Sequence, residues 1–248
     1  MSGGEKFSEM FFNPSKKEQK VNGVFSSVFN KYDAMNDISS LALHRLWKKT
    51  FANSIVVNDN TDILDVSTGS GDIANLLLKK ARHKNIKIHL TLSDYNENML
   101  SLAKKRFDGV IDNNNFLVLD ACKLSHQTQK KFDIITCSFG VRNFYNVNEG
   151  LGQIYKTLKT EGAFYCLEFS PLEKGLFKSL YSKYSNNILP FLGQKIAGDG
   201  EAYKYLASSI DNFLKPEQFL TQMRQIGYKN CFYTNIFGGL VAMYYGSK

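Results

Sequence analysis

The sequence contains no long hydrophobic run, few prolines and no low-complexity linker. No apolar run approaches the roughly 18 residues needed to cross a bilayer, and the first 20 residues have no signal-peptide core. We therefore expect a soluble, cytoplasmic protein. With only 4 prolines, no internal repeat and no Pro/Gly/Ser-rich linker, the 248 residues are predicted to form a single domain spanning 1–248.

Cysteine and histidine are also scarce, and neither shows a ligand spacing. The cysteines are Cys122, Cys137, Cys166 and Cys231, and the histidines are His44, His83, His89 and His126. The cysteines lie far apart with no C-x-x-C pair, which favours buried, reduced thiols over disulfides. The histidines show no zinc-type spacing, so the sequence indicates no metal.

The charge is basic, with a formal net value of +8 at pH 7. Short lysine and arginine clusters carry much of it, at residues 48–49, 79–80, 104–106 and 130–131. Such a balance permits binding to nucleic acid or to anionic lipid. However, each cluster falls near a predicted helix end or in a polar loop, where solvated lysines are expected. We therefore interpret these clusters as solvent-exposed surface, with weak attraction to anionic lipid as the alternative.

Hydrophobic periodicity alternates between the strand and helix periods along most of the chain. Strands are predicted at 62–66, 86–92, 116–119, 132–137, 162–169, 230–236 and 240–245, and helices at 17–29, 39–51, 73–81, 96–107, 147–158, 176–188 and 216–226. This order predicts a Rossmann-like α/β fold with a doubly wound, mostly parallel seven-stranded sheet. Residues 1–60 form an N-terminal helical arm, and Gly238-Gly239 permits only an antiparallel hairpin at the C-terminus.

A glycine-rich turn follows the first predicted strand, in the segment LDVSTGSGD at 64–72. Gly69 and Gly71, with Ser70 between them, allow a nucleotide to approach the backbone. This pattern alone is weak evidence. A diphosphate favours a helix start without negative charge, whereas Asp65 and Asp72 place carboxylates here. The turn therefore suits a cationic ligand better.

Two further acids stand at strand ends. Asp94 closes the second strand, where a carboxylate can accept hydrogen bonds from both ribose hydroxyls, and Asp120 closes the third, where it can face an adenine amino group. Taken singly, each acid is better explained as a helix cap. Together they predict a site for S-adenosylmethionine, which carries an ammonium and a sulfonium group.

Several separate segments resemble one known family, the ubiquinone/menaquinone biosynthesis C-methyltransferases (UbiE/MenG). They are residues 32–37 (YDAMND), 44–48 (HRLWK), 138–143 (SFGVRN), 167–170 (LEFS) and 203–210 (YKYLASSI). The similarity covers nearly the whole chain in the same order. It implies a class I methyltransferase fold and S-adenosylmethionine as the methyl donor, with S-adenosylhomocysteine as product.

The resemblance carries cofactor contacts onto Ser70, Asp94, Asp120 with Ala121, and Ser138. The chain also departs from the family pattern. It has T-G-S-G-D at 68–72 where G-G-T-G-D is usual, and Asp120-Ala121 where Asn-Ala is usual. Residues 159–162 (KTEG) stand where K-P-G-G is common, which we interpret as a change in a surface turn.

The resemblance implies transfer of a methyl group to a ring carbon of a prenylated quinol, a reaction that needs a phenolate-like oxygen on the ring. Arg142 is a candidate to stabilise that oxyanion, with Asn143 as an orienting donor. Tyr32, Asp33 and His44 are candidates to take or relay the proton. The alternatives are that Arg142 pairs with an acid, that Asp33 caps a helix, and that His44 packs the arm.

The prenyl tail requires an apolar groove, which residues 171–215 are predicted to cover. It also suggests peripheral contact with the inner face of a membrane, a quinone-biosynthesis complex, or a homodimer. Three rival functions stay open: an NAD-dependent dehydrogenase, a methyltransferase acting on nucleic acid or another small molecule, and a scaffold subunit that binds cofactor without catalysis. No N/D-P-P-Y/F motif supports a nucleic-acid substrate, so we expect none.

Overall fold

The computed structural model describes residues 40–171 and 200–248, together with Lys17, Gln19, Val21, Gly23, Val24, Asn36 and Asp37; at 200–203 it describes the backbone only. The five described positions between 17 and 24 are helical, in agreement with the predicted arm helix. Tyr32, Asp33 and the predicted helix at 176–188 lie outside the described residues.

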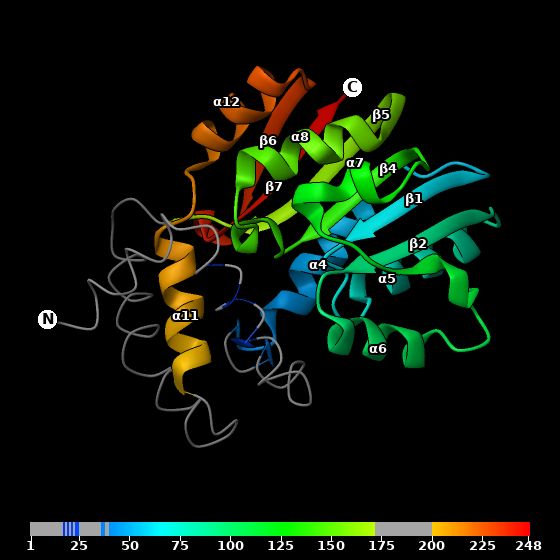
Figure 1. Ribbon diagram of the computed structural model, residues 1–248, viewed down its shortest axis with the longest axis horizontal. Helices are drawn as coiled ribbons and strands as arrows, with labels where there is room; N and C mark the ends of the chain where they lie inside the picture. The colour runs from blue at the N-terminus through cyan, green and yellow to red at the C-terminus, as the bar shows by residue number, and fades with distance from the viewer. Residues whose placement is uncertain are drawn as a thin grey trace, which may run out of the picture.

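A seven-stranded sheet forms the centre of the described structure, in the order β3-β2-β1-β4-β5-β7-β6 (Figure 1). Its strands are β1 (Thr61–Val66), β2 (Ile88–Asp94), β3 (Phe116–Val118), β4 (Phe132–Ser138), β5 (Leu158–Phe169), β6 (Lys229–Ile236) and β7 (Val241–Ser247). The first five are parallel, whereas β7 runs antiparallel to both β5 and β6. The predicted fold class is confirmed.

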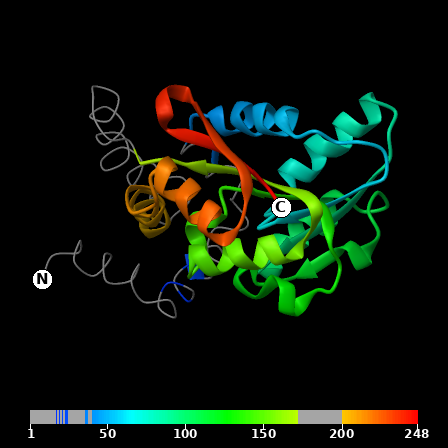
Figure 2. The same ribbon diagram turned by 90° about the horizontal axis from the view of Figure 1, so that it is seen from above.

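Helices cover both faces of this sheet (Figure 2). Those on its faces are α4 (Leu43–Ser54), α5 (Asp72–His83), α6 (Glu97–Arg106), α7 (Leu124–Gln127), α8 (Val147–Thr157) and α12 (Pro216–Ile226). Helix α11 (Gly200–Asp211) lies beyond the sheet (Figure 1). Short 3-10 turns are η2 (Asn113–Asn115), η3 (Ala121–Lys123), η4 (Val141–Asn143) and η6 (Phe237–Gly239). The last of these joins β6 to β7 in the predicted hairpin.

Two apolar cores form because the central strands are buried on both faces, as parallel strands usually are. One core packs α7, α8 and α12 against the sheet, with Leu151 and Phe219 fully buried. The other packs α4, α5 and α6 against the opposite face, with Phe51 and Leu77 fully buried. Three cysteines, Cys122, Cys137 and Cys166, are buried as predicted, whereas Cys231 is half-buried.

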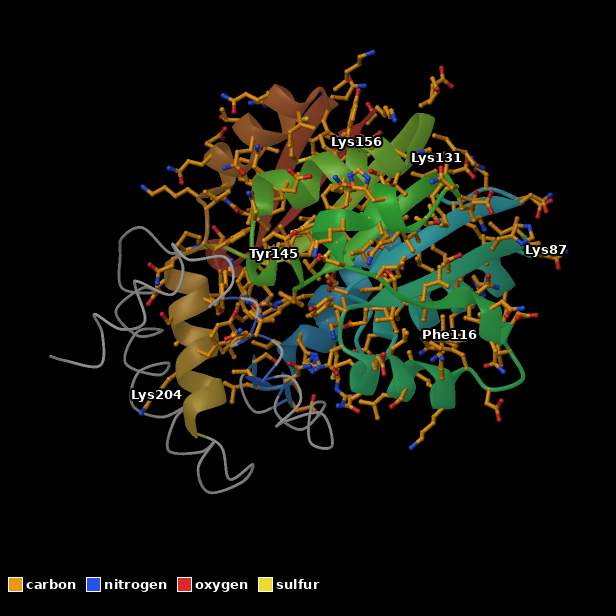
Figure 3. All side chains as sticks on the ribbon, in the orientation of Figure 1. Lys87, Phe116, Lys131, Tyr145, Lys156 and Lys204 are labelled. Carbon is orange, nitrogen blue, oxygen red and sulfur yellow. The ribbon has the colours of Figure 1, made fainter. Side chains whose placement is uncertain are left out.

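The topology places a ligand site at one edge of the sheet. The connection that leaves β1 runs to β2 on one side, and the connection that leaves β4 runs to β5 on the other. The carboxyl ends of the adjacent strands β1 and β4 therefore form the switch point where such sheets bind ligands. In Figure 3, Lys87 and Lys131, which precede β2 and β4, mark the opposite edge of the sheet, while Tyr145 lies on the side of α11.

Among the described helices, none combines the length and apolar character needed to cross a bilayer.

Candidate functional site

A cleft of about 790 Å³ opens at the switch point. Its walls come from the segments that follow four neighbouring strands, and Val21 of the arm also contributes. The lining residues are Val21, Ser67, Gly69, Asp94, Tyr95, Asn96, Met99, Leu119, Asp120, Ala121, Cys122, Ser138, Phe139, Gly140, Asn143, Phe144 and Tyr145. Of the predicted site residues, the structure brings together Gly69, Asp94, Asp120, Ala121, Ser138 and Asn143.

Asp94 joins the second strand to the turn after β1. Its Oδ2 accepts a hydrogen bond from the Gly69 N–H at 2.9 Å, and its Oδ1 accepts one from the Asn96 N–H at 3.0 Å. Gly69 adopts the left-handed conformation, with φ 58°, that turns this N–H towards the carboxylate. Burial raises the pKa of Asp94 to about 6, although backbone donors oppose the shift.

Asp120 and Ser138 each present a buried polar atom to the cleft. Oδ1 of Asp120 accepts from the Cys122 N–H at 2.8 Å, whereas Oδ2 has no hydrogen-bond partner among the described residues and lies 3.4 Å from Lys123 Nζ. The buried Ser138 Oγ likewise has no partner within the described chain. Because buried polar groups are normally hydrogen-bonded, these atoms indicate a site for polar ligand groups.

The turns after β1 and β4 meet in strained backbone at the cleft. Ser67 and Phe139 both have positive φ, at 53° and 56°, which is unusual for residues with a side chain. Gly140 allows the two turns to touch, since a Cβ there would lie 2.6 Å from Ser67 Cβ and 2.7 Å from Cys137 Sγ. The sequence prediction missed Ser67, although its place directly after a strand was the available signal.

Arg142 is buried behind the cleft and is not among its lining residues. It is 7% exposed, and its Nη1 pairs with Oε1 of the fully buried Glu168 at 2.9 Å. The same Nη1 donates to the Phe139 carbonyl at 2.5 Å, and the Arg142 backbone N–H donates to Glu168 Oε2 at 3.1 Å. The structure therefore shows the acid pairing that was the alternative interpretation, and Arg142 holds the η4 loop rather than facing the cleft.

Four residues predicted to contact a ligand are not among those that line the cleft: Asp65, Ser70, Gly71 and Asp72. Asp65 is 1% exposed because its carboxylate accepts from Thr68 Oγ1 and Thr136 Oγ1, both at 2.6 Å. Burial raises its pKa to about 6. Asp65 therefore links β1 to β4 from behind the cleft.

Asp72 and its neighbours are engaged elsewhere. Lys48 Nζ and Arg106 Nη1 pair with Asp72 at 2.7 and 2.6 Å and, against the effect of burial, hold the pKa of that carboxyl low. Arg106 also binds the Ser70 carbonyl at 3.1 Å. Gly71 is required for packing, because at φ 82° a Cβ would lie 2.5 Å from Phe107 Cε2.

His44 also lies outside the cleft. It lines a separate pocket with Arg45, Lys48, Asp72, Asn75, Leu76 and Arg106. Its Nε2 lies 2.9 Å from Asp37 Oδ1, and burial, with Lys48 nearby, lowers its pKa to about 4. A group with that pKa is a weak base near neutrality, so the position supports packing of the arm rather than proton transfer in the cleft.

The cleft also contains residues that the sequence prediction did not name. Met99, Phe139, Phe144 and Tyr145 give it an apolar wall, and Asn96 caps α6 by accepting from the Met99 N–H at 3.1 Å. Within the described chain, no group of His, Cys, Asp and Glu is arranged to hold a metal ion. The cleft can therefore bind a polar ligand through hydrogen bonds to its carboxylates, next to a flat apolar ligand packed on the aromatic side chains.

The amino-acid comparison decides the family. Residues 14–248 match the ubiE/COQ5 methyltransferase family. The chain belongs to that family. It is 45% identical over 236 residues to the ubiquinone/menaquinone biosynthesis C-methyltransferase UbiE of Rickettsia akari, covering 94% of each chain. It is 47% identical over 232 residues to the UbiE of Rickettsia rickettsii, covering 93% of each.

Solved structures support the fold of this family member. A SAM-dependent methyltransferase from Thermotoga maritima, described as a possible histamine N-methyltransferase, superposes with a TM-score of 0.59 at 15% identity, covering 92% of this chain and 99% of that one. A SAM-dependent methyltransferase from Aquifex aeolicus gives 0.56 at 12% identity, covering 87% and 97%. The fold is therefore that of the SAM-dependent methyltransferases.

Proposed function

We propose that this methyltransferase transfers a methyl group from S-adenosylmethionine to a ring carbon of a prenylated quinol in menaquinone or ubiquinone biosynthesis. The names of its relatives give methylation at carbon in ubiquinone and menaquinone biosynthesis, and the resemblance of the sequence motifs implies the prenylated quinol. The observation that carries the proposal is the cleft itself, whose lining combines the carboxylates of Asp94 and Asp120 with apolar side chains.

The residues present fit the methyl donor. Asp94 offers a carboxylate to the ribose hydroxyls. Asp120 offers Oδ2 to the adenine amino group; this oxygen is near Lys123 Nζ but accepts no hydrogen bond within the described residues. Ser138 Oγ is a further unused hydrogen-bonding group. When bound, the donor supplies an electrophilic methyl group on its sulfonium.

The chain's own contribution to the transfer is alignment and exclusion of water. Phe139, Phe144 and Tyr145 provide apolar surface for an aromatic ring. Asn143 is the one predicted catalytic residue within the described chain that lines the cleft, and its amide N–H groups are suited to a developing phenolate oxygen. Arg142 supports this loop from behind through Glu168 and the Phe139 carbonyl.

The apolar prenyl tail of the substrate bears on two further parts of the proposal, the cover over the substrate and the contact with a membrane or with other proteins. Residues 171–215 cover the substrate, and the chain meets the membrane or other quinone-synthesis proteins at its surface, as a monomer or a homodimer. The described part of the cover, α11, packs on η4 beside the cleft, which supports this placement. The dehydrogenase and scaffold alternatives lack a comparable observation.

The test is transfer of labelled methyl groups by the purified chain. We expect label from S-adenosylmethionine to enter reduced demethylmenaquinol, the corresponding 2-methoxy-6-polyprenyl-1,4-benzoquinol, or both. Asp94→Ala should abolish transfer at donor concentrations that saturate the wild type, whereas Asp108→Ala, an exposed acid outside the cleft, should not change it. Absence of label in both quinols would overturn the proposed function.

A further inference from the structure

Helix α11 carries two buried polar side chains whose role the proposed mechanism has not used. Tyr205 and Ser209 are 3% and 2% exposed. They stand four residues apart, so they lie on the same face of the helix. Both belong to the segment YKYLASSI at 203–210 that resembles a family motif without an assigned task.

This face of α11 contacts the two neighbouring residues of the η4 loop. Tyr205 Oη donates to Asn143 Oδ1 at 2.9 Å. Ser209 Oγ accepts from Arg142 Nε at 3.3 Å and donates to the Leu206 carbonyl at 2.8 Å. A helix some sixty residues away along the chain thus holds the residue that lines the cleft and the residue behind it.

These contacts determine which way the Asn143 amide points. The Phe139 carbonyl lies 3.4 Å from Asn143 Nδ2 and can only accept a hydrogen bond, so it selects the nitrogen. The Tyr205 hydroxyl then donates to Oδ1 on the other side. With Oδ1 occupied and one Nδ2 hydrogen directed at Phe139, the second Nδ2 hydrogen has no acceptor within the described part of the chain and is available to a ligand in the cleft.

We propose that Tyr205 is a positioning residue that fixes the Asn143 amide, so that its free N–H faces the ring oxygen of the quinol. This rests on the proposed function for the identity of the acceptor. Without the tyrosine hydroxyl, the amide loses the donor that holds Oδ1 and can rotate, which presents the acceptor to a developing negative charge for part of the time.

The first test is Tyr205→Phe, which removes one oxygen and keeps the ring. We expect kcat for methyl transfer to fall about tenfold, in line with loss of one oriented hydrogen bond, while KM for S-adenosylmethionine stays within about twofold. The matched control is Tyr228→Phe, which removes a buried hydroxyl that donates to the Leu151 carbonyl at 2.9 Å in the core. That variant should keep its kcat.

A double-mutant cycle separates positioning from general stability. If Tyr205 acts through Asn143, Tyr205→Phe should have no further effect on kcat in an Asn143→Ala background. An equal loss of kcat in both backgrounds, or in Tyr228→Phe, would overturn the proposal, as would unchanged kcat in Tyr205→Phe.

A readout independent of catalysis is the side-chain amide resonance of Asn143 in ¹⁵N-labelled protein, assigned by its absence in Asn143→Ala. It should shift in Tyr205→Phe and stay in place in Tyr228→Phe. An unshifted resonance would refute the hydrogen bond itself. Inactivity of the wild type towards both quinols would instead remove the proposed function, and the resonance would still decide the role of Tyr205.

Discussion

At the residue scale, Asp94 combines the roles of turn anchor and proposed cofactor ligand in one carboxylate. Burial raises its pKa to about 6, so the free protein binds a proton there near pH 6. Ribose hydroxyls donate hydrogen bonds, and the ionised carboxylate is the better acceptor. Affinity for S-adenosylmethionine is therefore present above pH 7 and is lost as the pH falls through 6.

This pH dependence is measurable by titration calorimetry. The Kd for S-adenosylmethionine should be flat between pH 7 and pH 8 and should rise by up to about tenfold per unit below pH 6. Asp94→Asn should bind more weakly and with a flat profile across this range. An Asp94→Asn variant that kept the wild-type pH dependence would assign the effect to another group, such as Asp65, whose pKa is also about 6.

Glu161 shows a second residue-scale effect, away from the cleft. It is exposed and has φ 64°, a conformation that suits glycine, and it stands where the family commonly has glycine. We expect Glu161→Gly to raise the free energy of unfolding by about 1 kcal/mol, since a left-handed residue with a Cβ costs that amount.

In a thermal melt the gain should appear as a Tm about 3 °C higher. Glu161→Ala is the control, because it removes the charge but keeps the Cβ, and it should show no gain. Equal stabilisation by both substitutions would attribute the effect to charge. Gly162→Ala should destabilise, since a Cβ there would lie 2.9 Å from the Lys159 carbonyl oxygen.

The strand-end acids also show what the sequence can and cannot predict about a site. Asp94 and Asp120 were predictable because carboxyl ends of parallel strands meet at one edge. Asp65 ends the first predicted strand and Asp72 begins the next helix, yet their partners come from distant segments: Thr136 on β4 for Asp65, and Lys48 and Arg106 for Asp72. The position of an acid relative to a strand end or helix start does not reveal such long-range pairing.

At the element scale, the alternation of strands and helices was predictable because each has its own hydrophobic period. The first and last residues of each helix and strand were less predictable. The predicted helix at 39–51 corresponds to α4 at Leu43–Ser54, and β5 begins at Leu158, four residues before the predicted strand. The irregular register between Phe132 and Ile134 on β4 accompanies that extension. Apolar periodicity does not record such irregular pairing.

The N-terminal arm supplies a prediction at this scale. Lys17 is 6% exposed and donates from Nζ to the Phe144 carbonyl at 2.5 Å, and Val21, one helical turn later, lines the cleft. Burial lowers the pKa of Lys17 to about 8, so the ammonium is the main form at pH 7. This contact fixes the arm to Phe144, which also lines the cleft.

Lys17→Met keeps the apolar stem and removes the donor. We expect its Kd for S-adenosylmethionine to rise about tenfold, as loss of a charge-assisted hydrogen bond implies. Gln19→Ala, an exposed position on the same helix, is the matched control and should bind as the wild type does. If Lys17→Met bound with wild-type affinity, the arm would have no part in holding the cofactor.

At the scale of the whole molecule, one sheet with a core on each face presents a polar cleft and an apolar wall at the same edge. Of the motifs that resemble the family, SFGVRN at 138–143 lines the cleft, and LEFS and YKYLASSI contact its Arg142 through Glu168 and Ser209. Arg142 shows the limit of that inference: its motif was recognisable, but its burial against Glu168 follows from the packing of β5 and α11 around the loop.

The central claim is methylation of a quinol at carbon by a donor bound in this cleft. The most direct measurement uses S-adenosylmethionine with a deuterated methyl group and a prenylated quinol whose unsubstituted ring position carries a visible proton resonance. The account predicts loss of that ring proton and a deuterated methyl group on the same carbon, with no transfer by Asp94→Ala. A retained ring proton with a deuterated methoxy group, or no incorporation at all, would contradict it.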